Sequence, residues 1–345
     1  MLDFLHSRRG AAVFLVILAV IPLLDPGRYW LHVINVTMIY ALVSLGQNII
    51  TGWCGMLTLG QAAFFGLGAY TSALLSLTFG LPFIVCFFAA GIMASIVGAL
   101  LSLPCLRVRT DFLSLITIAF NQLFFVVANN WMSLTRGPMG LPQVPRIEFF
   151  GFAAWSATDH YYVFLVIVAL AYFAVSRITG GATGRAWEMI RDDEVAARAV
   201  GVDVVRYKVL AFAVGCFLAG CAGSLFAHYL RLVSPDMFLL EESLIAMQMA
   251  ILGGLASLPG AALGAFLMIA IPEALRSSEP WLITLRPGIG GALLVILMIW
   301  RPHGLLSRRN TAPQSLRALS AWLRRGIGLD RAPRSPAERD RDNLR

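Results

Sequence analysis

Charged residues are scarce in this sequence. Only 13% of its 345 residues are Asp, Glu, Lys or Arg, whereas soluble domains carry about 25%. Hydrophobic residues make up 58%, the mean hydropathy is +0.76, and long apolar runs recur along the chain. Such runs cross a membrane as helices, because backbone groups in lipid must find their hydrogen bonds within the span. The composition therefore predicts a polytopic all-α membrane protein.

Sequence signatures of metal binding and nucleotide hydrolysis are also missing. The five His form no HExxH pair, the five Cys form no CxxC pair, and no GxxxxGK[ST] phosphate loop occurs. All five Cys lie in or beside apolar segments, which favours small buried side chains over disulfides. The sequence predicts no cofactor, no metal and no catalytic residues.

Positive charge is concentrated at one end of the chain. Eleven Arg and four acidic residues in 301–345 account for +7 of the net charge of +8. A basic tail is typical of the cytoplasmic side of a membrane, and the rest of the chain lacks the charge expected for nucleic-acid binding. Two structures remain open for the tail 307–345: a helix over 315–329 lying on the inner leaflet, or an unstructured extension.

Charge placement also predicts the number of spans. Arg8 and Arg9 before the first span and Arg301 after the last place both termini inside, which requires an even number. The basic loop after the sixth span then lies inside, and 132–159 lies outside among interfacial aromatic residues. We expect ten spans, the first an uncleaved helix, at 11–24, 30–50, 58–79, 82–103, 111–131, 160–177, 209–230, 242–257, 260–276 and 281–300.

Two glycine-rich stretches interrupt this helical pattern, one in each half of the chain, at 51–70 and 251–266. Broken helices at corresponding places are typical of a transport pathway, because an unwound turn offers backbone groups to a polar solute. The alternative is that the glycines only allow close helix packing. Including polar residues within spans, we expect the pathway to be lined by Thr51, Gly52, Gly55, Thr58, Gln61, Asn121, Gln248, Gly253 and Gly254.

The same spans contain no set of Asp, Glu and Lys that could relay protons or bind sodium ions. This absence argues against an autonomous secondary carrier and indicates that a transporter of this sequence takes its energy from a partner. A membrane enzyme is the other rival. Its only candidate metal-binding cluster is Asp192-Asp193-Glu194, which has no second acidic cluster to complete it.

The most polar stretch between two apolar ones is "GRAWEMIRDDEVAARAVGVDVVRYK", 184–208. Its spacing predicts one short amphipathic helix, capped by Thr183 and stopped by Gly201. One face carries Trp187, Met189 and Ile190, and the other carries Arg191, Asp192 and Arg198. Because the polar face mixes acidic and basic residues, it suits a protein partner better than anionic lipid. A solvated interfacial loop is the alternative interpretation.

Seven ordered motifs between about 30 and 306 resemble the permease subunits of branched-chain amino acid ABC transporters. They are "TGWCGMLTLGQAAFFGLGAY", "LRVRTDFLSLITIAF", "LTRGPMGLP", "GRAWEMIRDDEVAARAVGVDVVRYKVLAF", "SPDMF", "ILGGLASLPGAALGA" and "RPHGLL". The resemblance implies a type II importer-like permease domain at 1–306, in the bacterial inner membrane. It also implies a homologous second permease, two ATP-binding subunits and a periplasmic solute-binding protein as partners.

The resemblance further implies that 184–203 is a coupling helix, which docks on the ATP-binding subunit. The residues assigned to it are Gly184, Arg185, Trp187, Arg191, Asp192, Asp193, Glu194, Ala197 and Gly201. Related importers carry an E-A-A-x-x-x-G pattern here, and Val195 occupies its Glu position in this chain. The first two motifs also depart from the usual family pattern, so the solute remains open between branched-chain or other small hydrophobic amino acids and urea or short amides.

Overall fold

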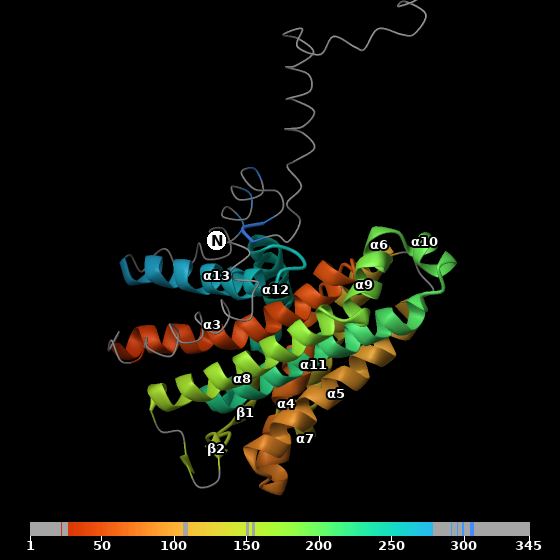
Figure 1. The fold of residues 1–345 in the computed structure, drawn as a ribbon. Coiled ribbons are helices and arrows are strands. Elements are labelled where there is room, and N and C mark those ends of the chain that lie inside the picture. Colours follow the sequence, from red (N-terminus) through yellow and green to blue (C-terminus); the bar gives the residue numbers. More distant parts are fainter. Residues whose placement is uncertain are drawn as a thin grey trace, which may run out of the picture. The chain divides into compact units, whose positions relative to one another are not determined.

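The protein is described by a computed structural model that covers residues 27–105, 110–149, 152–153 and 156–278, with the isolated positions 22, 291, 295, 299 and 304–306. Long helices dominate this part of the chain (Figure 1). They are α3 (Gly27–Asn48), α4 (Gln61–Phe79), α5 (Phe83–Cys105), α6 (Thr110–Asn130), α8 (Ala157–Thr179), α11 (Val204–Leu230), α12 (Leu240–Gly253) and α13 (Leu258–Ser278).

Six of these helices, α3, α4, α5, α6, α8 and α11, are long and apolar enough to cross a membrane. The predicted helical membrane fold is therefore confirmed, and six predicted spans agree with these helices to within a few residues. The eighth and ninth predicted spans correspond to α12, which has only 14 residues, and to α13. The first predicted span, apart from residue 22, and nearly all of the tenth lie outside the described residues, as does the tail beyond 306.

The helices form a buried centre and a periphery. Of the most apolar stretch of each helix, 89% is buried in α3 and 72% in α11. The buried share is only 28% in α5 and in α6, and 22% in α8. The peripheral helices are apolar on their exposed sides as well, as expected for surfaces that face lipid rather than water. Leu100, Leu115 and Leu170 are examples of such exposed side chains.

Small residues allow the central helices to approach each other closely. A Cβ atom on Gly68 of α4 would collide with the backbone of Gly220 on α11, and one on Gly46 of α3 would lie 2.5 Å from the carbonyl oxygen of Gly215. Without side chains at these points, backbones meet directly and gain van der Waals contact, which is the main attraction between helices in lipid. The close-packing role of Gly68 is thus evident in the fold.

Helix α3 does not end at a simple cap. It continues into a π-helical turn, η2 (Ile49–Trp53), and residues 55–60 then follow a non-helical path to α4. The third span was expected to begin at residue 58, but α4 begins at Gln61, because Gly55 adopts a left-handed φ of 75° and Gly60 is the residue before the helix. The break predicted at 51–70 therefore exists only in its first part, up to Gly60, because residues 61–70 form regular helix in α4.

The second predicted break lies between α12 and α13. Helix α12 stops at Gly253, because Gly254 has a φ of 115°, and α13 resumes at Leu258. The backbone N–H groups of Leu305 and Leu306 donate to the carbonyls of Leu252 and Gly253, each at 3.0 Å. These two bonds satisfy carbonyls that the end of a helix leaves without partners, which gives Leu305 and Leu306 a structural role.

Short elements connect the helices at both ends. At one end lie α7 (Met132–Thr135), η3 (Gly137–Met139) and η4 (Pro235–Phe238), with four two-residue strands. Strand β1 (Leu141–Pro142) pairs antiparallel with β4 (Leu232–Val233), and β2 (Glu148–Phe149) with β3 (Phe152–Ala153). At the opposite end lie α9 (Ala182–Asp192) and α10 (Glu194–Ala199), between α8 and α11 (Figure 1).

Candidate functional site

Asn48 joins the two broken segments. Its side-chain amide donates to the carbonyls of Gly254 at 3.1 Å and Ser257 at 3.2 Å, and its oxygen accepts from the N–H of Ala256 at 2.8 Å. A Cβ atom on Gly52 would collide with this amide. The two breaks, about 200 residues apart in the sequence, thus form one junction. Asn48 is therefore a functional candidate, although the sequence did not predict it as a pathway residue.

Gln47 organises the polar residues of the first break. Its side-chain nitrogen, fully buried, donates to the hydroxyl of Thr51 at 3.0 Å and to the carbonyl of Thr58 at 2.9 Å. The same nitrogen lies 3.3 Å from the sulfur of Met247 on α12. Thr51 and Thr58 were both predicted as pathway residues. They are held close together by Gln47, which was not predicted as one.

Two further side chains fix the start of α4. Ser243 accepts from the N–H of Ala62 at 2.9 Å and in turn donates to the side-chain oxygen of Asn121 at 3.5 Å. The hydroxyl of Thr117 accepts from the N–H of Leu59 at 3.0 Å. The first turn of a helix has N–H groups without intrahelical partners, and here α6 and α12 supply two hydroxyl acceptors for that region of the chain.

Not all predicted pathway residues meet at this junction. Gln61 extends towards α11, where its nitrogen donates to the carbonyl of Gly215 at 3.3 Å. Gln248 is half-buried and lies one helical turn after the exposed Leu244, on the outer face of α12. Gly253 packs directly against the backbone of Gly260. The structure thus brings Thr51, Gly52, Thr58, Asn121, Gly253 and Gly254 close to the junction and leaves Gln248 apart.

The segment predicted to form one amphipathic helix forms two. Asp193 has an extended backbone (φ −159°) and ends α9, and its carboxylate accepts from the N–H groups of Val195 and Ala196 at 2.8 and 3.0 Å. A carboxylate in this position caps the next helix, so Asp193 is a cap and not the mid-helix residue that was expected. Gly181 rather than Thr183 precedes α9, whereas Gly201, with a φ of 87°, ends the segment as predicted.

The apolar face of α9 is only partly as predicted. Trp187 is fully buried and its ring nitrogen donates to the carbonyl of Tyr207 at 2.8 Å, and Ile190 is also buried. Met189, expected beside them, is 42% exposed. Gly184 and Ala197 are buried, whereas Arg185 is exposed. Trp187 therefore anchors the segment on α11.

Arg191 does not lie on a free polar face. Its Nη1 donates to the carbonyl of Gly52 at 2.8 Å, and its Nε pairs with Asp192 at 3.4 Å. A Cβ atom on Gly55 would lie 2.7 Å from the Cγ of Arg191. A glycine at position 55 is thus favoured both by its left-handed φ and by the close approach of Arg191. Arg191 links α9 to the first broken segment.

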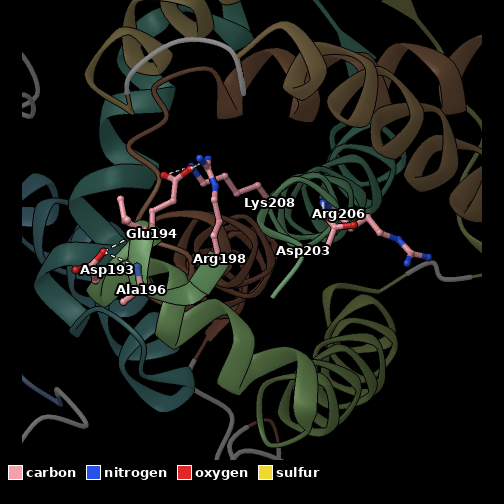
Figure 2. A network of polar contacts seen from close by, with 8 residues as sticks. Asp193, Glu194, Ala196, Arg198, Asp203, Arg206 and Lys208 are labelled. Atoms are coloured by element: carbon pink, nitrogen blue, oxygen red, sulfur yellow. Dashed lines mark hydrogen bonds and ion pairs between the residues drawn. The ribbon is translucent and has the colours of Figure 1, made fainter. Parts of the chain in front are cut away.

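Glu194 bridges α10 and α11. Its two carboxylate oxygens accept from Arg198 in the same helix and from the buried Lys208 on α11, the latter at 2.6 Å (Figure 2). Asp203 caps α11 through the N–H of Arg206 at 3.1 Å (Figure 2). Beside the exposed Arg198, the α10 surface presents two apolar side chains: Val195 is 76% exposed, and Val200, the residue just after the helix, is 71% exposed.

The thiol of Cys54 lies near the Glu194–Lys208 ion pair. Burial raises its pKa to about 12, with Lys208 lowering and Glu194 raising it. We expect alkylation of Cys54 by N-ethylmaleimide, with the other four Cys replaced by Ala, to rise about tenfold per pH unit from pH 7 to pH 10, because the thiolate fraction does so below the pKa. The Val195→Cys variant in a cysteine-free background is the control, and its exposed thiol levels off near pH 9. A similar plateau for Cys54 would contradict the prediction.

An apolar helix bundle built around a polar junction between two interrupted helices is the architecture of a membrane transport protein. The family model described as "Branched-chain amino acid transport system / permease component" matches residues 29–300. The chain therefore belongs to this family of permease components, which are not the ATP-hydrolysing subunits of their transporters.

Curated relatives agree with this assignment. The high-affinity branched-chain amino acid transport system permease protein LivM of Escherichia coli (strain K12) is 34% identical over 88% of this chain and 76% of its own length. The corresponding LivH protein of the same strain is 27% identical over 78% of this chain and 91% of its own length. A probable LivM of Methanocaldococcus jannaschii is 22% identical over 79% and 91%. No solved structure matches the chain significantly.

Proposed function

We propose that this chain forms half of the inner-membrane pathway of an ABC importer for branched-chain or other small hydrophobic amino acids. Family membership is the observation that carries the proposal. The permease domain extends over 1–306, with ten spans and both termini in the cytoplasm, and 307–345 is a cytoplasmic tail. ATP hydrolysis on two partner subunits drives transport, and a periplasmic solute-binding protein delivers the solute.

A homologous permease forms the other half of the pathway. In support, two differently named permease proteins of one transport system in Escherichia coli, LivM and LivH, are both similar to this chain. Gln248 and Leu244 on the outer face of α12 suit contact with such a partner, because Leu244 is 41% exposed although it lies on an interrupted helix near the polar junction.

The solute passes the junction of the two broken segments. Thr51, Gly52, Gly55 and Thr58 contribute from the first break, and Gly253 and Gly254 from the second, with Gln61 and Asn121 beside them. Backbone groups freed from helical bonds, together with the amides of Gln47 and Asn48, offer hydrogen bonds that lipid cannot. Rocking of α12 and α13 against α3 would alternate access to the two sides.

The segment 184–203 couples this pathway to the ATP-binding subunit. The basic residues Arg185, Arg198 and Arg206 near α9 and α10 favour the cytoplasmic side for this end of the bundle. Trp187 holds α9 on α11, so that a force applied to the exposed residues of α10 reaches the bundle. The exposed surface of α10 suits a protein groove, because it presents Val195 and Val200 beside the charged Arg198.

Uptake in proteoliposomes tests the proposed function. We expect the chain, assembled with a homologous permease, ATP-binding subunits and binding protein from its own genome, to accumulate radiolabelled L-leucine only when ATP is present. The same assembly without this chain is the control. Uptake of urea or acetamide but not leucine would favour the amide alternative, and leucine uptake by the chain alone would favour an autonomous carrier.

A further inference from the structure

Four buried polar atoms without partners gather around the start of α4. They are Oε1 of Gln47, Oγ1 of Thr58, Oε1 of Gln61 and Nδ2 of Asn121, and the four side chains are at most 1% exposed. Among the described residues, only three other buried side-chain atoms lack a hydrogen-bond partner. Buried polar atoms are normally paired, so a cluster of unpaired ones in a protein interior calls for an explanation.

The residues that carry these atoms surround one short stretch of the chain, with the Gln61 amide extending towards α11. Gln47 donates to the backbone carbonyl of Thr58, so its amide lies against residue 58. Asn121 contacts Ser243, which holds the N–H of Ala62 in the first turn of α4. Gln61 is the first residue of that helix. All four unpaired atoms are therefore carried by, or lie next to, the stretch Thr58–Ala62.

The neighbourhood lies deep in the bundle. Gln61 contacts Gly215, which is eleven residues into α11, and Asn121 is eleven residues into α6. At about 1.5 Å per helical residue this is about 16 Å from the helix starts, or half of an apolar layer about 30 Å thick. An interrupted helix that begins at this depth presents the positive end of its dipole at the membrane centre.

The chemistry of the cluster selects for a particular kind of solute. Gln47 and Gln61 offer acceptors, Asn121 offers a donor, Thr58 offers both, and none of the four carries a charge. Such a set can bind a solute without net charge, and in a zwitterion its acceptors suit the ammonium group and its donors suit the carboxylate. Apolar groups adjoin it: Phe64 stacks on Phe120 at 5.2 Å between ring centroids, and the sulfur of Met247 contacts Gln47.

We propose that Gln47, Thr58, Gln61 and Asn121 form a transient binding site, halfway through the membrane, for the ammonium and carboxylate groups of a zwitterionic amino acid. The amide oxygens of Gln47 and Gln61 accept from the ammonium group, while the Asn121 amide and the Thr58 hydroxyl donate to the carboxylate. This inference rests on the proposed function and adds to it a defined site. Because the side chains are buried, the solute reaches them only when α4, α6 and α12 move apart.

Isosteric substitutions separate a binding role from a structural one. Thr58→Val removes an unpaired polar atom, so the melting temperature of the purified complex is expected to stay the same or rise. Asn121→Leu removes an unpaired Nδ2 together with the Oδ1 that accepts weakly from Ser243 at 3.5 Å, so its melting temperature is expected to change little. The maximal rate of leucine uptake, at saturating loaded binding protein, is expected to fall by about tenfold for each lost hydrogen bond. A gain in stability combined with a loss of transport is a result that a purely structural role does not give.

Thr37→Val is the matched control. Thr37 is also a buried threonine of the central bundle, but its hydroxyl is satisfied by the carbonyl of Val33 in its own helix, at 2.8 Å. This variant is expected to keep the uptake rate, with an equal or slightly lower melting temperature. Unchanged uptake in both Thr58→Val and Asn121→Leu would overturn the site, as would a fall in uptake that parallels a fall in melting temperature.

The outcome also separates this inference from the proposed function. If the unmodified complex accumulates leucine and the two variants match it, the site is wrong and the function stands. If the unmodified complex accumulates no leucine, the proposed function fails and the site fails with it. As a second measurement, equilibrium binding of radiolabelled leucine to the complex without binding protein is expected to weaken about tenfold in Thr58→Val; equal binding would contradict the site.

Discussion

Replacing Arg191 by Met is expected to lower leucine uptake by about ten- to a hundredfold while the ATP-binding subunits still co-purify with the permease. Arg191 donates to the carbonyl of Gly52 at 2.8 Å, and this bond directly links α9 to the first broken segment. A hydrogen bond from a charged donor contributes about 1.5–3 kcal/mol, which corresponds to this range of rates. The measurement is uptake in proteoliposomes, with ATP hydrolysis recorded in parallel.

The neighbouring Arg198 provides a matched control. Arg198→Met removes the same charge from the same segment, but Arg198 is exposed and pairs only with Glu194 among the described contacts, so uptake is expected to change less than twofold. Arg191→Lys keeps a donor and is expected to recover part of the rate. ATP hydrolysis that continues without uptake in Arg191→Met would indicate that docking and transmission are separate steps. Equal uptake in both Met variants would contradict the role of Arg191.

Span positions could be predicted from the sequence because they depend on local properties. An apolar run must be long enough to cross the lipid and must satisfy its own backbone, and both conditions can be judged within about 20 residues. This is why α5 and α6 begin within one residue of their predicted starts. The same local rule predicted breaks within 51–70 and 251–266, where glycines accumulate, although the structure resumes helix at Gln61 and Leu258.

The partners of polar side chains could not be predicted in this way. Asn48 binds Gly254 across 206 positions, and Ser243 binds Ala62 across 181. No periodic pattern within either segment encodes such a pair. A signal was nevertheless present, because an amide or hydroxyl inside an apolar helix is costly unless it is satisfied. Gln47 and Asn48 carried that signal, and the structure shows that they connect the broken segments.

The 184–203 segment illustrates a different limit. Its helical periodicity continues through Asp193, so a single helix was predicted, although Asp is also a favoured N-cap. Whether Asp193 continues one helix or caps a second depends on contacts with α11. Glu194 bonds to Lys208 there, and Trp187 bonds to the carbonyl of Tyr207. These contacts require α10 to turn relative to α9. Arg191 was assigned to a free face for the same reason, since its partner Gly52 is 139 positions away.

A second large effect is expected at the exposed surface of α10. Val195→Asp and Val200→Asp are each expected to weaken association with the ATP-binding subunit by about thirty- to a hundredfold, measured by co-purification at graded subunit concentrations. The proposed contact would bury these valines, and burying an unpaired carboxylate there costs about 2–3 kcal/mol. The permease itself should remain folded, because the two side chains are 76% and 71% exposed.

Val205→Asp tests whether charge alone is responsible. Val205 is 49% exposed at the start of α11, outside the α10 surface, where an added carboxylate suits the positive end of the helix dipole. It is therefore expected to leave both association and melting temperature unchanged. Weak association in all three variants would point to general repulsion by negative charge. Full association in Val195→Asp and Val200→Asp would locate docking elsewhere on the permease, and Arg191 would then transmit no force from the ATP-binding subunit.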